Sequence, residues 1–183
     1  MSPAATSTIG FSAAALSSTA STWSSARAAL FQTAALSAAR LGTLVEPAFT
    51  GLPAFLAGDQ PASSGVMALE YVAHSALADI RRLAAPAALG SAVLSRGLEE
   101  QANFSTQAAR AATDTVAAYR IVLGCELVAA VRALGMRARP PAPGPLRSAY
   151  ELAAGVLDPR TEDRPLDADV DVADRLLAGL AAL

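Results

Sequence analysis

Lysine is absent from this chain of 183 residues, so all 14 of its basic residues are arginines. Without lysine the chain cannot form a pyridoxal Schiff base, supply the lysine of a phosphate-binding loop or use a lysine as general base. The net charge is -2, which provides no basic surface for nucleic acid. These absences exclude several common enzyme classes, and we expect no nucleic-acid partner.

Cysteine and histidine occur only once each. Cys125 lies in the apolar run of residues 121–131, which predicts a buried thiol that packs as a small hydrophobic side chain. A single cysteine cannot form a disulfide within the chain, and this fits a reducing compartment. His74 has no second histidine or cysteine nearby in the sequence. We therefore expect a structural or interface histidine and no metal site.

Charged residues make up only 16% of the chain, against 53% hydrophobic residues. This balance is apolar for a soluble monomer, although much of the apolar share is alanine, which favours helix. Residues 1–26 carry no charged side chain, yet they lack the basic region of a signal peptide. No uninterrupted apolar run reaches the ~18 residues of a membrane span. The sequence therefore predicts a cytoplasmic protein with no membrane partner.

Apolar residues recur at spacings of three and four, and no alternating strand pattern is present, so we expect an all-α protein. Residues 1–10 are too small and polar to build a core and are expected to form a flexible arm, leaving residues 11–183 as a single helical domain. The expected helices cover residues 13–41, 66–83, 98–134, a stretch that begins at Pro145, and 169–183, with a short helical or turn segment at 87–94.

Proline and glycine mark the boundaries of these helices. Pro47, Gly51 and Pro53 follow the first helix and are expected to end it. Gly135 is well placed as the left-handed residue that follows the third helix. Pro145 suits the first turn of the fourth helix, where its missing N–H is not needed.

The third expected helix is too long for a compact monomer. About 37 residues at ~1.5 Å per residue give ~55 Å, whereas a compact domain of this size is about 40 Å across. Its projecting apolar stripes would require partners, so we expect an obligate oligomer built as a long-helix bundle that includes further copies of the chain. The alternative is a kink at Gly124 that folds the helix back on itself.

Several segments carry a resemblance to a known family. Residues 44–56 contain Gly-Leu-Pro-Ala-Phe-Leu, residues 64–67 read Ser-Gly-Val-Met, Glu126-Leu127 is followed by Ala129-Ala130, and residues 161–166 read Thr-Glu-Asp-Arg-Pro-Leu. In order and spacing these segments resemble the C-terminal third of the histidine and phenylalanine ammonia-lyase family, from about residue 34 onward. Upstream, a Ser/Ala tract at residues 11–25 stands where the family has a Gly-Asn-Phe-His stretch lining the substrate pocket.

The resemblance implies a helical bundle completed by oligomerisation, without the family's reactive centre. The methylidene-imidazolone electrophile of these enzymes forms from an Ala-Ser-Gly triplet upstream of the matching part, so we expect no cofactor in this chain and expect that group in a partner subunit. The family's catalytic tyrosine also lies upstream. The triplet Ser63-Ser64-Gly65 aligns with a different part of the family fold, and we do not expect it to form the electrophile.

The resemblance also implies candidate active-site residues. In the family, a Glu or Gln at the head of the long helix faces the electrophile. An ungapped alignment from Pro86 puts Glu99 on this position and Glu100 on the following Asp, whereas a shift of two residues would put Gln101 there. The first register also places Arg110 on a family arginine. The same three residues read equally well as a polar, acidic first helical turn that complements the helix dipole.

Two functions are compatible with these observations. The chain is expected to be the small subunit of a split ammonia-lyase or aminomutase, supplying bundle helices and Glu99 to a larger subunit that carries the electrophile and most of the amino-acid pocket. The alternative is a non-catalytic helical scaffold or regulatory pseudoenzyme partner, which the eroded Gly-Asn-Phe-His region favours. The initiating Met1 and the polar arm lead us to expect a complete subunit.

Overall fold

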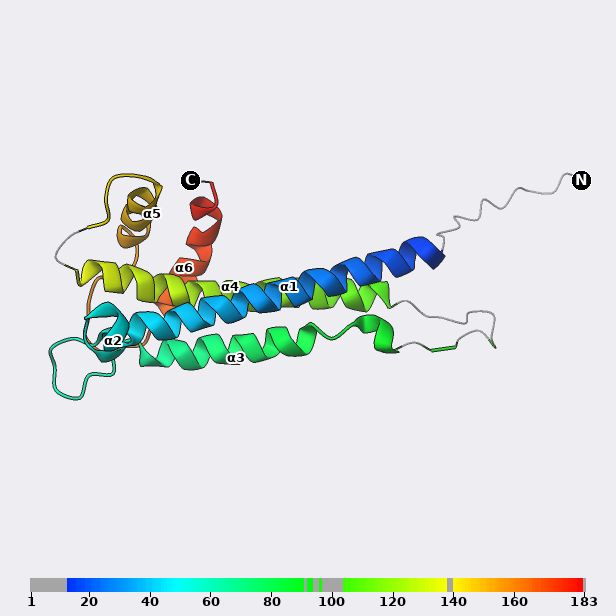
Figure 1. The fold of residues 1–183 in the computed structure, drawn as a ribbon, viewed down its shortest axis with the longest axis horizontal. Coiled ribbons are helices and arrows are strands. Elements are labelled where there is room, and N and C mark those ends of the chain that lie inside the picture. The colour runs from blue at the N-terminus through cyan, green and yellow to red at the C-terminus, as the bar shows by residue number, and fades with distance from the viewer. Residues whose placement is uncertain (1–12, 91, 94–95, 97–103, 138–139, 183) are drawn as a thin grey trace, which may run out of the picture.

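Three long helices form an elongated bundle (Figure 1). The computed structural model describes residues 13–90, 92–93, 96, 104–137 and 140–182. The long helices are α1 (Ala13–Val45), α3 (Met67–Leu83) and α4 (Ser105–Gly135). They lie side by side, with α3 antiparallel to the other two.

Shorter helices gather at the C-terminal end of α4 (Figure 1). These are α2 (Pro47–Thr50), η1 (Ala54–Leu56), α5 (Pro145–Ala154) and α6 (Asp167–Leu180), while η2 (Ala87–Gly90) follows α3. The described part of the chain contains helices and no strand, which confirms the all-α prediction.

The core consists mainly of small and aliphatic side chains where α1, α3 and α4 meet. Leu41, Leu69 and Cys125 are all 1% exposed or less, and alanines such as Ala34 and Ala129 are fully buried beside them. Alanine at these positions lets the helix backbones approach closely. The prediction that Cys125 is a buried thiol is confirmed.

The helix boundaries follow the sequence signals in most places. Pro47 and Gly51 follow α1 as expected: the Glu46 side chain accepts a hydrogen bond from the backbone of Ala48, and Gly51 adopts a left-handed φ of 68°. Pro145 stands in the first turn of α5, which confirms the predicted start of that helix.

One prediction about α4 lies partly outside the described residues, and a second is wrong. The described helix begins at Ser105 after Phe104, which has a left-handed φ of 47°, so the predicted helix does not continue through Phe104; its predicted start at Leu98 falls among residues 97–103, outside the described part. Gly135 is the last helical residue rather than the left-handed residue after the helix. Met136 follows with φ −76° and donates to the Arg132 carbonyl, so the chain leaves the helix through right-handed backbone.

The alternative of a kinked helix is also wrong, because α4 runs unbroken through Gly124. A Cβ at Gly124 would lie 3.4 Å from Val170 Cγ1 and from the Val170 carbonyl oxygen. Glycine at this position therefore lets α6 cross α4 closely. With 31 residues, α4 is about 46 Å long, which remains longer than a compact domain of this size.

One part of α1 is long and apolar enough to span a membrane by length and composition. Within Ser21–Val45, an 18-residue stretch has a mean hydropathy of 1.2, and 28% of that stretch is buried. The segment includes Arg27 and Arg40, so it is not an uninterrupted apolar run of the kind that the sequence analysis considered; its alanines keep the mean high. A core helix of a soluble protein passes the same test, and α1 packs along both α3 and α4.

Candidate functional site

The predicted catalytic positions Glu99, Glu100 and Gln101 lie outside the described residues, as does the predicted arm of residues 1–10. Their register therefore stays a prediction. His74, the single histidine considered above, is exposed on α3, as is Tyr71. Among the residues that the structure describes, no group of three or more His, Cys, Asp and Glu side chains could hold a metal ion.

Arg27 connects the beginning of α4 to the end of α3. The residue is 0% exposed, and its guanidinium donates to the Ala108 carbonyl at 2.7 Å and to the Ala85 carbonyl at 3.1 Å. Burial lowers the pKa of Arg27. Its Nε is buried without a hydrogen-bond partner in the described part of the chain. This arginine therefore fixes the first turns of α4 against α1 and the end of α3.

Glu126 connects α4 to α1. Its carboxylate accepts a hydrogen bond from the Ser37 hydroxyl and two from Arg40, at 2.5 Å from Nε and 2.8 Å from Nη2. Ser37 is fully buried, and 17% of the Glu126 side chain is exposed. The Glu126-Leu127 segment therefore holds two helices together, and its carboxylate already has three donors.

Asp163 holds the bend at residues 63–65. It accepts hydrogen bonds from the Ser63 hydroxyl at 2.6 Å, from the Ser64 N–H at 2.7 Å and hydroxyl at 2.9 Å, and from the Gly65 N–H at 2.9 Å. These donors, the Ser63 hydroxyl first, hold the pKa of Asp163 well below its usual range. The Ser-Ser-Gly triplet thus has a structural partner in Asp163.

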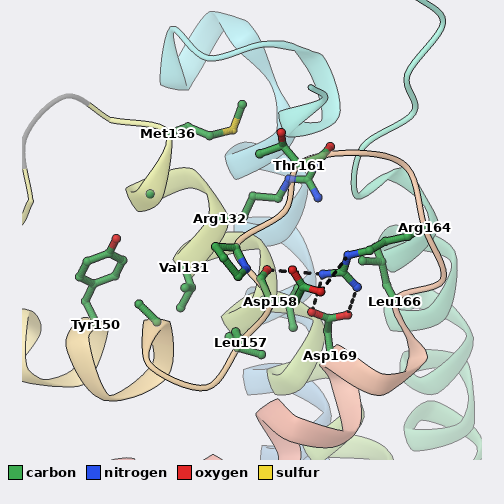
Figure 2. Close-up of a pocket in the computed structure, with 14 residues that line it drawn as sticks. Val131, Arg132, Met136, Tyr150, Leu157, Asp158, Thr161, Arg164, Leu166 and Asp169 are labelled. Carbon is green, nitrogen blue, oxygen red and sulfur yellow. Dashed lines mark hydrogen bonds and ion pairs between the residues drawn. The ribbon is translucent and has the colours of Figure 1, made fainter. Parts of the chain in front are cut away.

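A pocket of about 390 Å³ lies between the C-terminal half of α4, α5 and the loop that leads to α6 (Figure 2). Its walls are mostly apolar. They are formed by Val128, Val131 and Gly135 of α4 and Met136 directly after it, by Tyr150 and Ala154 of α5, and by Leu157, Pro159 and Leu166 of the loop. The polar lining consists of Arg132, Asp158, Thr161, Arg164 and Asp169.

Two arginines of this pocket differ in how their charge is balanced. Arg164 donates to both oxygens of Asp169, at 2.5 and 2.8 Å, and lies 3.7 Å from a carboxylate oxygen of Asp158. Arg132 donates instead to two backbone carbonyls, to Leu56 at 2.9 Å and to Thr161. Figure 2 shows Arg132 beside the Arg164–Asp169 pair. Arg132 therefore has neutral partners, whereas Arg164 has anionic ones.

Residues 7–154 match the family described as aromatic amino acid lyase. The chain is a member of the aromatic amino acid lyase family. The match begins upstream of residue 34, where the sequence resemblance was expected to fade, and therefore includes the whole Ser/Ala tract of residues 11–25. It ends before the Thr-Glu-Asp-Arg-Pro-Leu segment at residues 161–166.

The lyase-family chain is similar to the histidine ammonia-lyase of Symbiobacterium thermophilum, with 35% identity over 141 residues. This alignment covers 75% of the chain and 27% of that enzyme. The chain therefore spans less than a third of the length of this relative.

Solved structures show the same fold. The chain superimposes on histidine ammonia-lyase from Trypanosoma cruzi with a TM-score of 0.82 and 23% identity, over 88% of this chain and 32% of that one. For tyrosine aminomutase from Streptomyces globisporus the TM-score is 0.78 at 23% identity, over 88% of this chain and 31% of that one. These likenesses establish the ammonia-lyase fold, which lyases and aminomutases share.

The family resemblance identified Glu126 and Asp163 through their motifs, and the structure shows that both are intramolecular anchors. The sequence analysis did not identify the pocket around Arg132. From the sequence alone, Arg132 is an arginine in the last turn of a helix, a position at which the helix dipole commonly favours a cation. Its carbonyl partners, Leu56 and Thr161, come from segments far away in the sequence, so no local pattern could have indicated them.

Proposed function

We propose that this lyase-family chain is the helical small subunit of a split ammonia-lyase or aminomutase complex. A larger subunit of the same family would carry the methylidene-imidazolone electrophile, which activates the amino group of the substrate for elimination. This chain would complete the helical bundle and place Glu99 next to that group. The family membership and the ammonia-lyase fold support the proposal.

The observation that carries the proposal is an apolar groove along α3 and α4. The groove has a volume of about 390 Å³ and is lined by Tyr71, Val72, Ser75, Ala76, Asp79, Ala118 and Ile121. Tyr71 is 71% exposed and Val72 42%. Contiguous apolar surfaces of this kind mark association sites in soluble proteins. A neighbouring helix with an apolar stripe would fill the groove, as expected for a bundle assembled from several chains.

The second candidate function is a non-catalytic scaffold that kept the bundle. It is favoured by the use of the family motifs within the fold, since Glu126 is bound by Arg40 and Ser37, and Asp163 by residues 63–65. Such motifs would persist for stability alone, with or without chemistry. Both functions require the same packing of the helices, and they differ only in whether Glu99 contributes to catalysis.

The association is tested by purifying the tagged full chain from its native source and measuring the intact masses of the proteins that accompany it. We expect a stoichiometric larger protein of the lyase family whose mass is lower than that encoded by the loss of two waters, the signature of the electrophile. Recovery of the chain alone, or with an unmodified protein, would contradict a split lyase.

Two matched variants test whether the groove mediates that association. Tyr71→Glu places a charge in the groove at a position that is 71% exposed, so the chain should still fold but lose its partner. Leu146→Glu changes an apolar residue on α5 that is 66% exposed and lies outside the groove, and it should retain the partner. Equal recovery with both variants would contradict this role of the groove.

Glu99→Ala in the recovered complex separates the two candidate functions. In the lyase, the variant should assemble normally and lose most of its amino-acid elimination activity, with Glu126→Gln as a control for a carboxylate used in packing. In the scaffold, assembly and activity of the larger subunit should both be unchanged by Glu99→Ala.

A further inference from the structure

The guanidinium of Arg132 carries a positive charge that is not balanced by an ion pair with any residue that the structure describes. Its hydrogen bonds go to the carbonyl oxygens of Leu56 and Thr161. An arginine has five N–H donors, and these two carbonyls account for only part of them. Donors therefore remain for a further acceptor.

The surroundings of Arg132 make an additional anion favourable. Burial is the main reason that the pKa of Arg132 is lowered, and the nearby positive charge of Arg164 adds to it, whereas Asp163, Asp169 and Glu162 act in the opposite direction. The net effect is that the local environment disfavours the cation. A partly buried charge of this kind is stabilised when an opposite charge binds beside it.

Asp163, Asp169 and Glu162 act to raise the pKa of Arg132, but no ion pair joins any of them to Arg132 in the described part of the chain, where its hydrogen bonds go to carbonyl oxygens. Asp169 accepts two hydrogen bonds from Arg164. Asp158 is bound by Arg160, which is the main reason that its pKa lies well below the usual range. Of the two arginines that line this pocket, Arg132 is thus the one without an ion pair to a described carboxylate.

The remaining walls of the pocket suit an apolar ligand body. Val128, Val131, Met136 and Leu157 line it together with the ring of Tyr150, and Figure 2 shows Tyr150 on the side of the pocket away from Arg164. The volume of about 390 Å³ falls within the usual range of small-molecule sites, roughly 300–1,000 Å³. An anionic group at one end and an apolar body at the other would match this lining.

We propose that the pocket between α4, α5 and the 157–166 loop binds a small monocarboxylate with an aromatic or aliphatic body, whose carboxylate pairs with Arg132. This inference does not depend on the proposed function, because every contact comes from the chain itself. Tyr150 and the α4 side chains enclose the body of the ligand, and Arg132 selects for its charge.

Benzoate is a suitable probe, and benzamide is its neutral counterpart of nearly the same shape. Isothermal titration or ligand-detected NMR with the full chain, in the assembly in which it is purified, should show benzoate binding at least about tenfold more tightly than benzamide, as expected for a charge-assisted hydrogen bond. The affinity for benzoate should fall as salt is added. Equal affinities for the two probes, or no binding of benzoate, would overturn the proposal.

Variants locate the binding in the pocket. Arg132→Gln should remove the preference for benzoate over benzamide, although the loss of its bonds to Leu56 and Thr161 can also disturb the fold. Ala154→Leu avoids this problem, because it fills the pocket from α5 without touching Arg132, and it should abolish benzoate binding in a chain with unchanged circular dichroism. Arg147→Gln on the same helix lies outside the pocket and should leave the affinity unchanged. Retained affinity in a folded Ala154→Leu variant would refute the location.

Discussion

Gly65 is the position at which a single methyl group should do the most damage to this fold. Its φ is +54°, and a Cβ on it would lie 2.3 Å from the carbonyl oxygen of Phe55 and 2.8 Å from the amide nitrogen of Ala57. Both are backbone atoms, so rotation of a side chain cannot relieve the contact. Gly65→Ala must therefore push the segment that contains Leu56 away from the 63–66 bend.

The cost of Gly65→Ala has several parts. A left-handed φ costs an alanine roughly 1–2 kcal/mol. The displaced Phe55 oxygen also accepts a hydrogen bond of 2.9 Å from Val66, and loss of such a bond costs about 1 kcal/mol. Leu56, which is 0% exposed, would shift as well, along with the bond between its carbonyl and Arg132. We expect a loss of about 3 kcal/mol in the free energy of unfolding.

Gly51→Ala is the matched control, because Gly51 has a similar φ of +68° but no atom within 4 Å of the added Cβ. It should lose only the conformational part, about 1 kcal/mol after the lower entropy of the unfolded variant is included. The two variants should therefore differ in melting temperature by about 4–8 °C. Urea unfolding followed by far-UV circular dichroism gives the free energies. Equal losses in both variants would refute the steric argument.

Three further predictions concern other buried or paired groups. Hydrogen bonds depress the pKa of Asp163, so its carboxylate stabilises the fold above the unfolded pKa of about 3.9, and this stabilisation is lost as the pH falls below that value. Melting curves recorded over a series of pH values should show the melting temperature of the wild type falling in acid. The fall should be smaller in Asp163→Asn. Glu126→Gln weakens the hydrogen bonds from Arg40 and should lower the free energy of unfolding by about 1–3 kcal/mol. Glu151→Gln removes one partner of the exposed Arg147–Glu151 pair and should lower it by less than about 0.5 kcal/mol. Urea titration measures both. Burial raises the pKa of Cys125 to about 11, so a thiol reagent at neutral pH should react at the rate of unfolding, and fast reaction without denaturant would contradict the burial.

The long helices could be predicted from the sequence because their signals are local. The apolar spacing and the residues Pro47, Gly51 and Pro145 correctly indicated α1, α3 and the start of α5. The end of α4 was misjudged at Gly135, because a glycine near the end of a helix only permits left-handed backbone and does not require it. Right-handed backbone at Met136 keeps its bond to Arg132.

The pocket could not be predicted because its members depend on contacts between distant segments. Arg132 meets the carbonyl of Leu56, 76 positions away, and that of Thr161, 29 positions away. No periodicity connects such residues. Their proximity follows only after α4 has packed along α1 and the loop before α6 has folded back over the end of the bundle.

In the motifs by which this chain resembles the lyase family, Glu126 and Asp163 make contacts that stabilise the fold. Glu126 of α4 binds Arg40 of α1, which lies 86 residues earlier in the sequence, and Asp163 binds Gly65, which lies 98 residues earlier. Each contact fixes a crossing between segments that any bundle of this shape requires. Selection for stability alone would preserve both, so their presence would survive the loss or transfer of catalysis. A test of the proposed catalytic role must therefore change Glu99 within the proposed complex, since a change in Glu126 or Asp163 would lower stability and obscure any effect on activity.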